Sequence, residues 1–170
     1  LYIVAIGAIT NIASALLIKP EIAENIRQDF SAFEKTIYSF DYDNDKYGYK
    51  TMIDVDSFVD YFILNEFTTN YDAGWLSTYV YKDVDGKFKM CIWDFNSSCD
   101  NYQEQAIVPE GFNFQYCVWD VMLMKDEDFN ERIISRYNAL RKTYLNEEYL
   151  NQYIDDTVDY LGNAVARNFE

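Results

Sequence analysis

The chain has 170 residues, of which 49% are hydrophobic, and this is enough for one domain with a substantial core. Its 14 Lys and Arg residues are outnumbered by 29 Asp and Glu residues, which gives a net charge of −15. This charge argues against nucleic acid and anionic membranes as partners and favours cations and basic proteins, although a soluble acidic surface explains it equally well. The sequence has no histidine, which excludes Ser-His-Asp and Cys-His catalysis and all histidine metal sites.

Three cysteines, Cys91, Cys99 and Cys117, are odd in number and lack the spacing of a zinc site. We expect three free thiols, with a single bridge between Cys99 and Cys117 as the alternative. The cysteines therefore leave the redox compartment open.

Residues 1–18 carry no charged side chain and read LYIVAIGAITNIASALLI. A membrane-spanning helix needs about 20 apolar residues, and the polar Thr10, Asn11 and Ser14 weaken that interpretation. We expect a buried strand or helix that continues from sequence before Leu1, with a membrane role as the alternative.

An amphipathic helix is predicted to start at Pro20, because apolar residues recur from there at helical steps. Its buried face is expected to carry Ile22, Ile26, Phe30, Phe33 and Ile37. The next segment, residues 40–54, begins with alternating aspartates like an EF-hand loop. It lacks the glycine and the glutamate that such a loop needs at its sixth and twelfth positions, which predicts a solvated acidic loop instead of a calcium site.

Residues 57–96 form the segment around which we expect the rest of the chain to fold. Residues 55–70 are apolar on nearly every side, which predicts a buried helix capped by Asp56 or Ser57, with Asp60 completing a capping box. The polar Asn65 and Glu66 lie within this helix and need partners if they are buried. We expect both to be hydrogen bonded and to support the corner that follows.

A β-hairpin is the next predicted element, with strands at 75–82 and 87–93 and a type I′ turn at Asp85-Gly86. Because Asp72 precedes the first strand and Asp94 follows the second, closure of the hairpin brings the two carboxylates within about 8 Å of each other. Two converging carboxylates suit a divalent cation such as Mg²⁺. The alternative is that Asp72 caps a turn and Asp94 is a solvated strand end.

The last third of the chain is predicted to be a long loop followed by three helices. The loop, residues 97–117, either engages a substrate or is a passive surface segment. A short helix at 118–124 is followed by one that Asp126 caps, with Phe129, Ile133, Tyr137 and Leu140 on its buried face. The final helix begins at Asn146, has a weak point at Gly162, and is expected to direct these residues into the core: Leu150, Ile154, Val158, Leu161, Val165 and Phe169.

Three parts of the sequence together resemble the CotH kinase family: DYFILNEFTTNYDAGWLSTYVYKD, then KMCIWDFN, then KDEDFNERIISRYNALRK with the later AVARN. The resemblance covers residues 20–170. It implies an α+β fold that is mostly helical, with one β-hairpin, similar to the C-terminal lobe of a kinase. It also implies that residues 1–170 form a single domain and that the N-terminal nucleotide lobe lies outside this chain.

The resemblance further implies an atypical protein kinase that transfers the γ-phosphate of ATP to Ser or Thr, with Mg²⁺ or Mn²⁺ as the metal. By this resemblance Asp72 and Asn70 are catalytic, and Asp94 and Asn96 hold the metal. Asn65 and Glu66 would support them, and the nucleotide-binding residues are not identified. The expected substrate is a basic, Ser-containing protein of the spore coat or cell surface. A non-catalytic coat or adhesion protein on the same scaffold is the alternative.

The sequence departs from the family pattern in three places. Cys91-Ile92 stands where the family commonly has Gly-Pro and one further residue, and Asn96 replaces a frequent aspartate. The chain also has no glycine-rich loop and no recognisable Lys-Glu pair. We therefore expect this chain to bind Mg²⁺ weakly and ATP barely.

Overall fold

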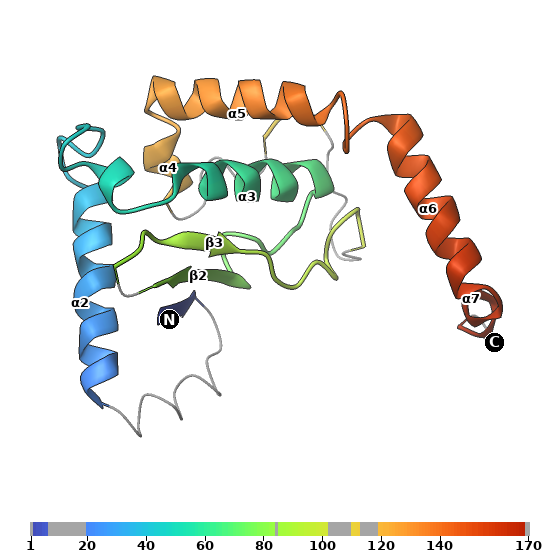
Figure 1. Ribbon diagram of the computed structural model, residues 1–170, viewed down its shortest axis with the longest axis horizontal. Helices are drawn as coiled ribbons and strands as arrows, with labels where there is room; N and C mark the ends of the chain where they lie inside the picture. The colour runs from blue at the N-terminus through green and yellow to red at the C-terminus, as the bar shows by residue number, and fades with distance from the viewer. Residues whose placement is uncertain (1, 7–19, 84, 102–109, 113–118, 169–170) are drawn as a thin grey trace. The chain divides into compact units, whose positions relative to one another are not determined.

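The structure, a computed structural model, describes residues 2–6, 20–83, 85–101, 110–112 and 119–168 (Figure 1). In these ranges the fold is α+β and mostly helical, which confirms the predicted class. The chain divides into two compact units, Leu1–Ile133 and Ile134–Glu170, which are described separately. The expectation of one domain over residues 1–170 stays a prediction.

The first unit is built on an antiparallel sheet of three strands in the order β1-β2-β3. They are β1 (Tyr2–Ile6), β2 (Thr78–Lys82) and β3 (Lys89–Cys91). The hairpin of β2 and β3 confirms the prediction, with shorter strands, and β1 confirms a strand at the start of the chain. Residues 7–18 lie outside the described ranges, and no helix in those ranges is long and apolar enough to cross a membrane.

The turn of the hairpin differs from the prediction. Gly86 does not have a positive φ, so Asp85-Gly86 is not a type I′ turn. Instead, the Gly86 N–H donates to the Asp83 carbonyl at 3.0 Å. The reason lies at Phe88, whose N–H donates to the Met52 carbonyl and whose own carbonyl accepts from the Asp54 N–H, at 2.9 and 2.8 Å. Because of these two bonds, Phe88 does not pair with β2. The loop between the strands is therefore longer than the two-residue turn that the sequence predicts.

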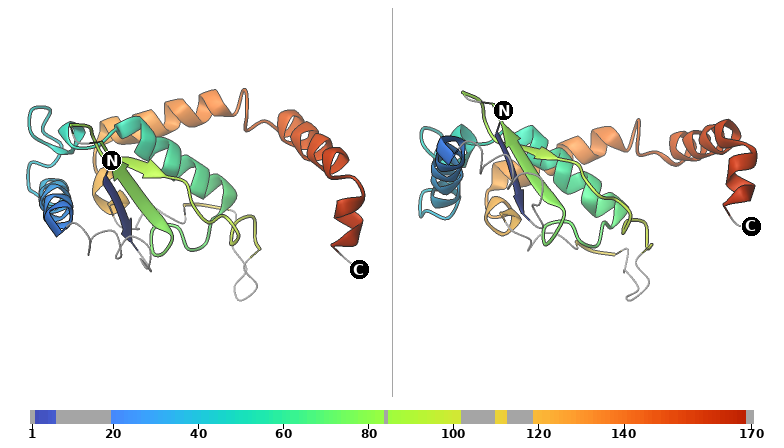
Figure 2. Two further views of the ribbon diagram at one scale, coloured as in Figure 1. Left: turned by 60° about the horizontal axis from the view of Figure 1, so that its bottom comes forward. Right: turned by 90° about the horizontal axis from the view of Figure 1, so that it is seen from below.

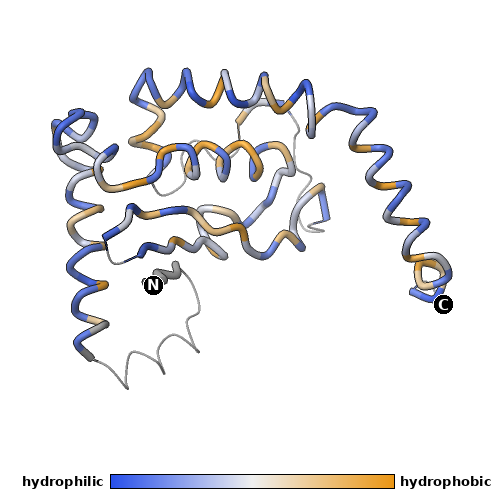
Figure 3. The backbone as a smooth tube through the Cα atoms, viewed as in Figure 1, coloured by the Kyte–Doolittle hydropathy of each residue, from blue (hydrophilic) through white to orange (hydrophobic). Residues whose placement is uncertain are grey.

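Helix α3 (Val55–Thr68) packs along β3 and carries a long run of apolar residues (Figures 1, 2 and 3). Its cap is Asp54, whose carboxylate accepts from the Ser57 N–H at 3.2 Å, so the predicted cap at Asp56 or Ser57 and the capping box with Asp60 are wrong. The Ser57 hydroxyl is engaged elsewhere, since it accepts from the Met90 N–H at 2.9 Å. The predicted burial is confirmed for Phe58, Val59, Tyr61, Phe62, Ile63 and Asn65.

Helix α2 (Pro20–Ile37) confirms the predicted amphipathic helix, and its Phe33 and Ile37 are fully buried. It joins the core through a cluster of aromatic rings with neighbouring centroids 5.0–6.3 Å apart. The cluster draws on α2, α3, the hairpin loop and the residue before α4 (Asp120–Leu123), and consists of Phe30, Phe33, Phe58, Phe88 and Trp119.

Residues 40–54 are not the fully solvated loop that the sequence predicts. The acidic first half is exposed, but the second half turns inward at the short helix η1 (Tyr49–Thr51), and Tyr49 and Ile53 are fully buried. Gly48 permits this turn, because a Cβ at that position would lie 2.3 Å from the Tyr42 carbonyl oxygen. The aspartates in the first half of this segment gave no indication that Tyr49 and Ile53, in the second half, are buried.

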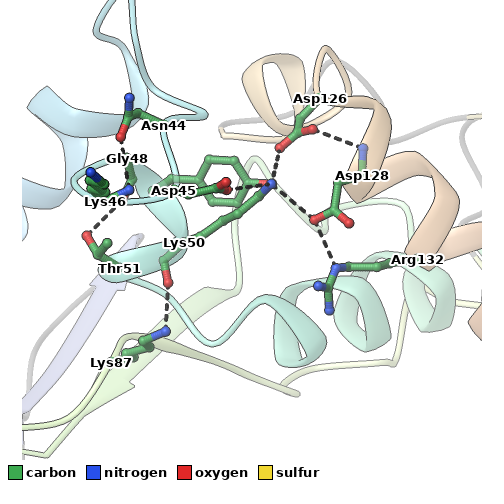
Figure 4. A network of polar contacts seen from close by, with 11 residues as sticks. Asn44, Asp45, Lys46, Gly48, Lys50, Thr51, Lys87, Asp126, Asp128 and Arg132 are labelled. Atoms are coloured by element: carbon green, nitrogen blue, oxygen red, sulfur yellow. Dashed lines mark hydrogen bonds and ion pairs between the residues drawn. The ribbon is translucent and has the colours of Figure 1, made fainter.

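A network of buried charges fastens this anchor to the start of α5 (Glu127–Leu140) (Figure 4). The Lys50 ammonium lies 3.1 Å from an oxygen of Asp126 and 3.1 Å from an oxygen of Asp128. The buried Tyr49 hydroxyl donates to Asp126 at 2.7 Å. Burial alone would lower the pKa of Lys50, but its hydrogen bonds to Asp128 and Asp126 outweigh this and raise that pKa.

Asp126 also confirms its predicted role as the cap of α5, since its second oxygen accepts from the Asp128 N–H at 2.9 Å. Phe129 and Ile133 are buried, as predicted, whereas Tyr137 and Leu140 are only half-buried. The network continues outward through Arg132, which donates to Asp128 at 3.1 Å. One aspartate thus caps a helix, accepts from a buried tyrosine and pairs with a lysine.

The second unit contains the rest of α5, helix α6 (Glu147–Leu161) and helix α7 (Asn163–Arg167). The predicted cap is confirmed, because the Asn146 side chain accepts from the Tyr149 N–H at 2.8 Å. The helix is interrupted at Gly162, which has φ 52. The single final helix predicted from the sequence is therefore two helices in the structure. The predicted burial of its apolar stripe is also wrong, since Ile154, Val158 and Leu161 are exposed. Helical spacing shows that one face is apolar, but not that another element covers it.

Candidate functional site

The site is positioned by a corner that joins the end of α3 to β2. Asn65 and Asn70 are each 1% exposed, and their side chains are joined by a bond of 3.0 Å from the Asn70 amide to the Asn65 oxygen. The Asn65 amide in turn donates to the Tyr61 carbonyl at 2.8 Å. A second support comes from the buried Thr78, whose hydroxyl accepts from the Gly74 N–H at 2.8 Å. The prediction that Asn65 is buried and holds the corner is confirmed.

Asp72 and Asp94 meet at the end of the hairpin, where one hydroxyl contacts both. The Ser77 Oγ lies 3.4 Å from Asp72 Oδ2 and 3.2 Å from Asp94 Oδ2. The two carboxylate oxygens can be no farther apart than the sum of these distances, which is within the separation expected from hairpin closure. The structure therefore confirms that the acids converge, while the roles assigned to them stay predictions.

The segment after β3 is held against the end of α3 by two backbone bonds. The Cys99 N–H donates to the Thr68 carbonyl at 2.6 Å, and the Tyr71 N–H donates to the Ser97 carbonyl at 3.4 Å. These bonds close the loop that carries Asp94 onto the corner that carries Asp72. The convergence of the acids thus depends on this closure as well as on the hairpin.

Two buried oxygens in this region, Asp72 Oδ1 and Asn70 Oδ1, have no hydrogen-bond partner among the residues that the structure describes. Buried acceptors are normally satisfied, so each is ready to accept from a ligand or to contact a cation. Mg²⁺ is commonly bound by one or two carboxylates and completes its coordination with water and phosphate oxygens. The oxygen donors at this corner fit such an ion, although the described residues contain no group of three acidic, cysteine or histidine side chains that could hold a metal alone.

The structure places the remaining predicted residues less favourably. Asn96 is exposed, and its backbone carbonyl accepts from the Asn101 side-chain amide at 2.7 Å. Its role toward a metal stays a prediction. Cys91 and Cys99 are free thiols, while Cys117 and most of the long loop lie outside the described residues.

Glu66 is half-buried, so it is less enclosed than Asn65. Its carboxylate influences Asp120, the first residue of α4. Burial raises the pKa of the Asp120 carboxyl to about 8, and the negative charge of Glu66 adds to this effect. The folded protein therefore favours the protonated form of Asp120 more than the unfolded chain does.

The stability of the fold should depend on pH through Asp120. Its pKa is about 8 when folded against an ordinary value of 3.8, so the folded state binds this proton more tightly, and stability falls as the pH rises from about 4 to 8. We expect Asp120→Asn to raise the melting temperature relative to the parent at pH 8 and to change it little at pH 4. Asp85→Asn, on the exposed hairpin loop, is the control. Equal pH slopes in the parent and in Asp120→Asn would contradict this prediction.

Sequence reasoning missed two residues that matter to this region. Ser77 was read only as an alternating position of the first strand, although it lies outside β2 and has a positive φ of 47. Asp120 was read as part of an apolar run. A carboxylate within such a run was the available signal for Asp120, whereas nothing local marked Ser77.

Two carboxylates at the end of a hairpin, with unsatisfied oxygens beside them, define the kind of site that binds a hard divalent cation. A model of the family described as CotH kinase protein matches residues 13–170 of the chain. The chain therefore belongs to the CotH kinase family. Comparisons with curated proteins and with solved structures gave no match.

Proposed function

We propose that the chain is the metal-binding and catalytic part of a protein kinase that transfers the γ-phosphate of ATP to Ser or Thr of a basic protein. Family membership supports the class of reaction. The observation that carries the proposal is the convergence of Asp72 and Asp94 on the Ser77 hydroxyl. A spore-coat or cell-surface location belongs to the same proposal.

In this proposal Asp72 accepts the proton of the acceptor hydroxyl, and Asn70 supports it from the buried corner. Asp94 and Asn96 hold Mg²⁺ or Mn²⁺, which when bound neutralises negative charge on the phosphates. Asp94 is exposed and Asp72 is half-buried, so both can be reached from solvent. The net charge of −15 favours a cationic acceptor protein.

The second candidate is a coat or adhesion protein that binds a partner without phosphate transfer. Large apolar side chains next to the acids favour it, since Trp75 and Trp93 are 69% and 58% exposed. Exposed apolar patches often mark protein interaction sites. Such side chains suit a kinase that docks a protein substrate equally well, so phosphate transfer is what separates the two functions.

The proposal is tested with the full-length protein, ATP labelled at the γ-phosphate, and a panel of basic Ser-containing proteins. Phosphoserine that appears only with Mg²⁺ or Mn²⁺, identified by mass spectrometry, is the expected result. Capture of the same proteins without metal-dependent phosphate transfer would contradict the proposal and favour the binding protein.

The isolated chain should bind Mg²⁺ with a dissociation constant in the millimolar range, about −4 kcal/mol, and should bind ATP barely. Residues 66–81 and 90–101, which form the corner and the end of the hairpin, contain no Lys or Arg to offset phosphate charge. Calorimetric titration of Mg²⁺ and of Mg-ATP measures both affinities. A micromolar affinity for ATP would show that the chain contains phosphate contacts of its own.

A further inference from the structure

Ser77 has a position that no role assigned so far explains. Its hydroxyl lies between Asp72 Oδ2 and Asp94 Oδ2, at 3.4 and 3.2 Å. A hydroxyl has one proton, so it can donate to only one of the two carboxylates at a time. In the part of the chain that the structure describes, neither carboxylate has another hydrogen-bond donor. The proton of the Ser77 hydroxyl therefore lies between the negative charges of Asp72 and Asp94.

The backbone on both sides is arranged to make this contact. Ser77 has φ 47 and Asp94 has φ 58, and the left-handed region costs roughly 1–2 kcal/mol for a residue other than glycine. The turn before β2 is fixed next to Ser77, because the buried Thr78 hydroxyl donates to the Leu76 carbonyl at 2.9 Å. Two residues with an unfavourable backbone conformation, Ser77 and Asp94, are thus in contact through the Ser77 hydroxyl.

We propose that Ser77 is the positioning residue of the cation site. Without a cation, its proton keeps the Asp72 and Asp94 carboxylates at a fixed spacing. Ser77, Asp72 and Asp94 would together hold a divalent cation, and rotation of the hydroxyl about its Cβ–Oγ bond would turn its proton away from the carboxylates and leave its oxygen free as a donor of electron pairs. No covalent bond forms or breaks. The identity of the cation, Mg²⁺, rests on the proposed function, whereas the contact with both carboxylates does not.

Loss of this hydroxyl should weaken cation binding. The two carboxylates would then repel each other without an intervening donor, and the cation would lose an oxygen that faces it. Changes in residues that orient metal ligands typically reduce metal affinity by about 10- to 100-fold. We expect a loss of at least about 10-fold here, since Ser77 contacts both acids.

The decisive variants are Ser77→Gly and Ser77→Asn in the full-length protein. Glycine adopts the φ of 47 without strain, so a loss of affinity in Ser77→Gly reports the hydroxyl and not the backbone. Asparagine also tolerates this conformation and carries both a donor and an oxygen, so Ser77→Asn should retain most of the affinity. The matched control is Ser97→Ala. Ser97 lies in the loop that carries Asp94, and its hydroxyl has no hydrogen bond in the described structure.

The readout is the affinity for Mn²⁺ by electron paramagnetic resonance and for Mg²⁺ by calorimetry, both without nucleotide. We expect Ser77→Gly to lose affinity at least about 10-fold while Ser77→Asn and Ser97→Ala stay close to the parent. Parent-like affinity in Ser77→Gly, an equal loss in Ser97→Ala, or no Mn²⁺ binding by the parent would overturn the inference. If the expected losses occur but the parent transfers no phosphate, the proposed function fails and the role of Ser77 stands.

Discussion

Asp94→Asn and Asp72→Asn should each lower the proposed phosphate transfer by at least about 1,000-fold, or roughly 4 kcal/mol of transition-state stabilisation. Removing a single neutral donor to a developing charge already costs about 100- to 1,000-fold, and a carboxylate that holds a metal or accepts a proton contributes at least as much. Asparagine is chosen because Asp94 has φ 58, a backbone conformation that asparagine tolerates better than alanine. The melting temperature should therefore change little.

The controls for this experiment are two acidic residues remote from the site. Asp85→Asn changes an exposed carboxylate at the opposite end of the same hairpin, and Asp41→Ala changes one in the acidic loop before η1. Both variants should transfer phosphate at nearly the rate of the parent, as measured with ATP labelled at the γ-phosphate. Parent-like phosphate transfer in Asp94→Asn would contradict its role as a metal ligand, and no transfer by the parent itself would favour the protein that binds without catalysis.

The largest effect on stability should come from Asp126→Ala, at about 3 kcal/mol or more of the free energy of unfolding. This change leaves the Tyr49 hydroxyl and the Lys50 ammonium without their shared partner and also removes the cap of α5. Lys50 keeps Asp128 at 3.1 Å, so the main cost comes from the buried Tyr49 hydroxyl, which loses its acceptor, and from the lost cap of α5. Urea denaturation of the parent and the variant measures the difference.

Asp45 provides the matched comparison, since it approaches the same Lys50 ammonium at 3.9 Å but has a side chain that is 91% exposed. An exposed ion pair contributes little, so Asp45→Ala should change the free energy of unfolding by less than about 1 kcal/mol. Similar costs for the two alanine variants would mean that burial does not govern this network. Figure 4 shows both carboxylates on either side of the same lysine.

The convergence of the acids could be predicted because it follows from local rules. Alternating residues identified the strands, and two strands joined by a short loop must place Asp72 and Asp94 at one end. The turn itself could not be predicted, because Phe88 is held by backbone bonds to Met52 and Asp54, which lie more than thirty positions earlier. Local turn chemistry gives no information about such a distant partner.

The other misses have the same physical origin. Lys50 and Asp126 are 76 positions apart, so their pairing leaves no pattern in either neighbourhood, and the acidic loop looked solvated along its full length. Ile154 and Val158 were predicted to be buried but are exposed. Helical spacing identifies an apolar face of a helix, but it does not show whether another element packs against that face. Asn65 succeeded for the opposite reason, since its partners lie at Tyr61 and Asn70, within one helical turn or so.

The two backbone bonds of Phe88 separate the hairpin loop from the acids at the other end of the hairpin. Both backbone bonds hold the chain just after the hairpin loop, before β3 begins, whereas the two acids lie beyond the far end of the strands. Substitutions or insertions among residues 83–87 are thereby separated from Asp72 and Asp94 by a fixed point in the backbone. We therefore expect substitutions or an inserted peptide in this loop to leave the spacing of the two acids at the opposite end of the hairpin unchanged.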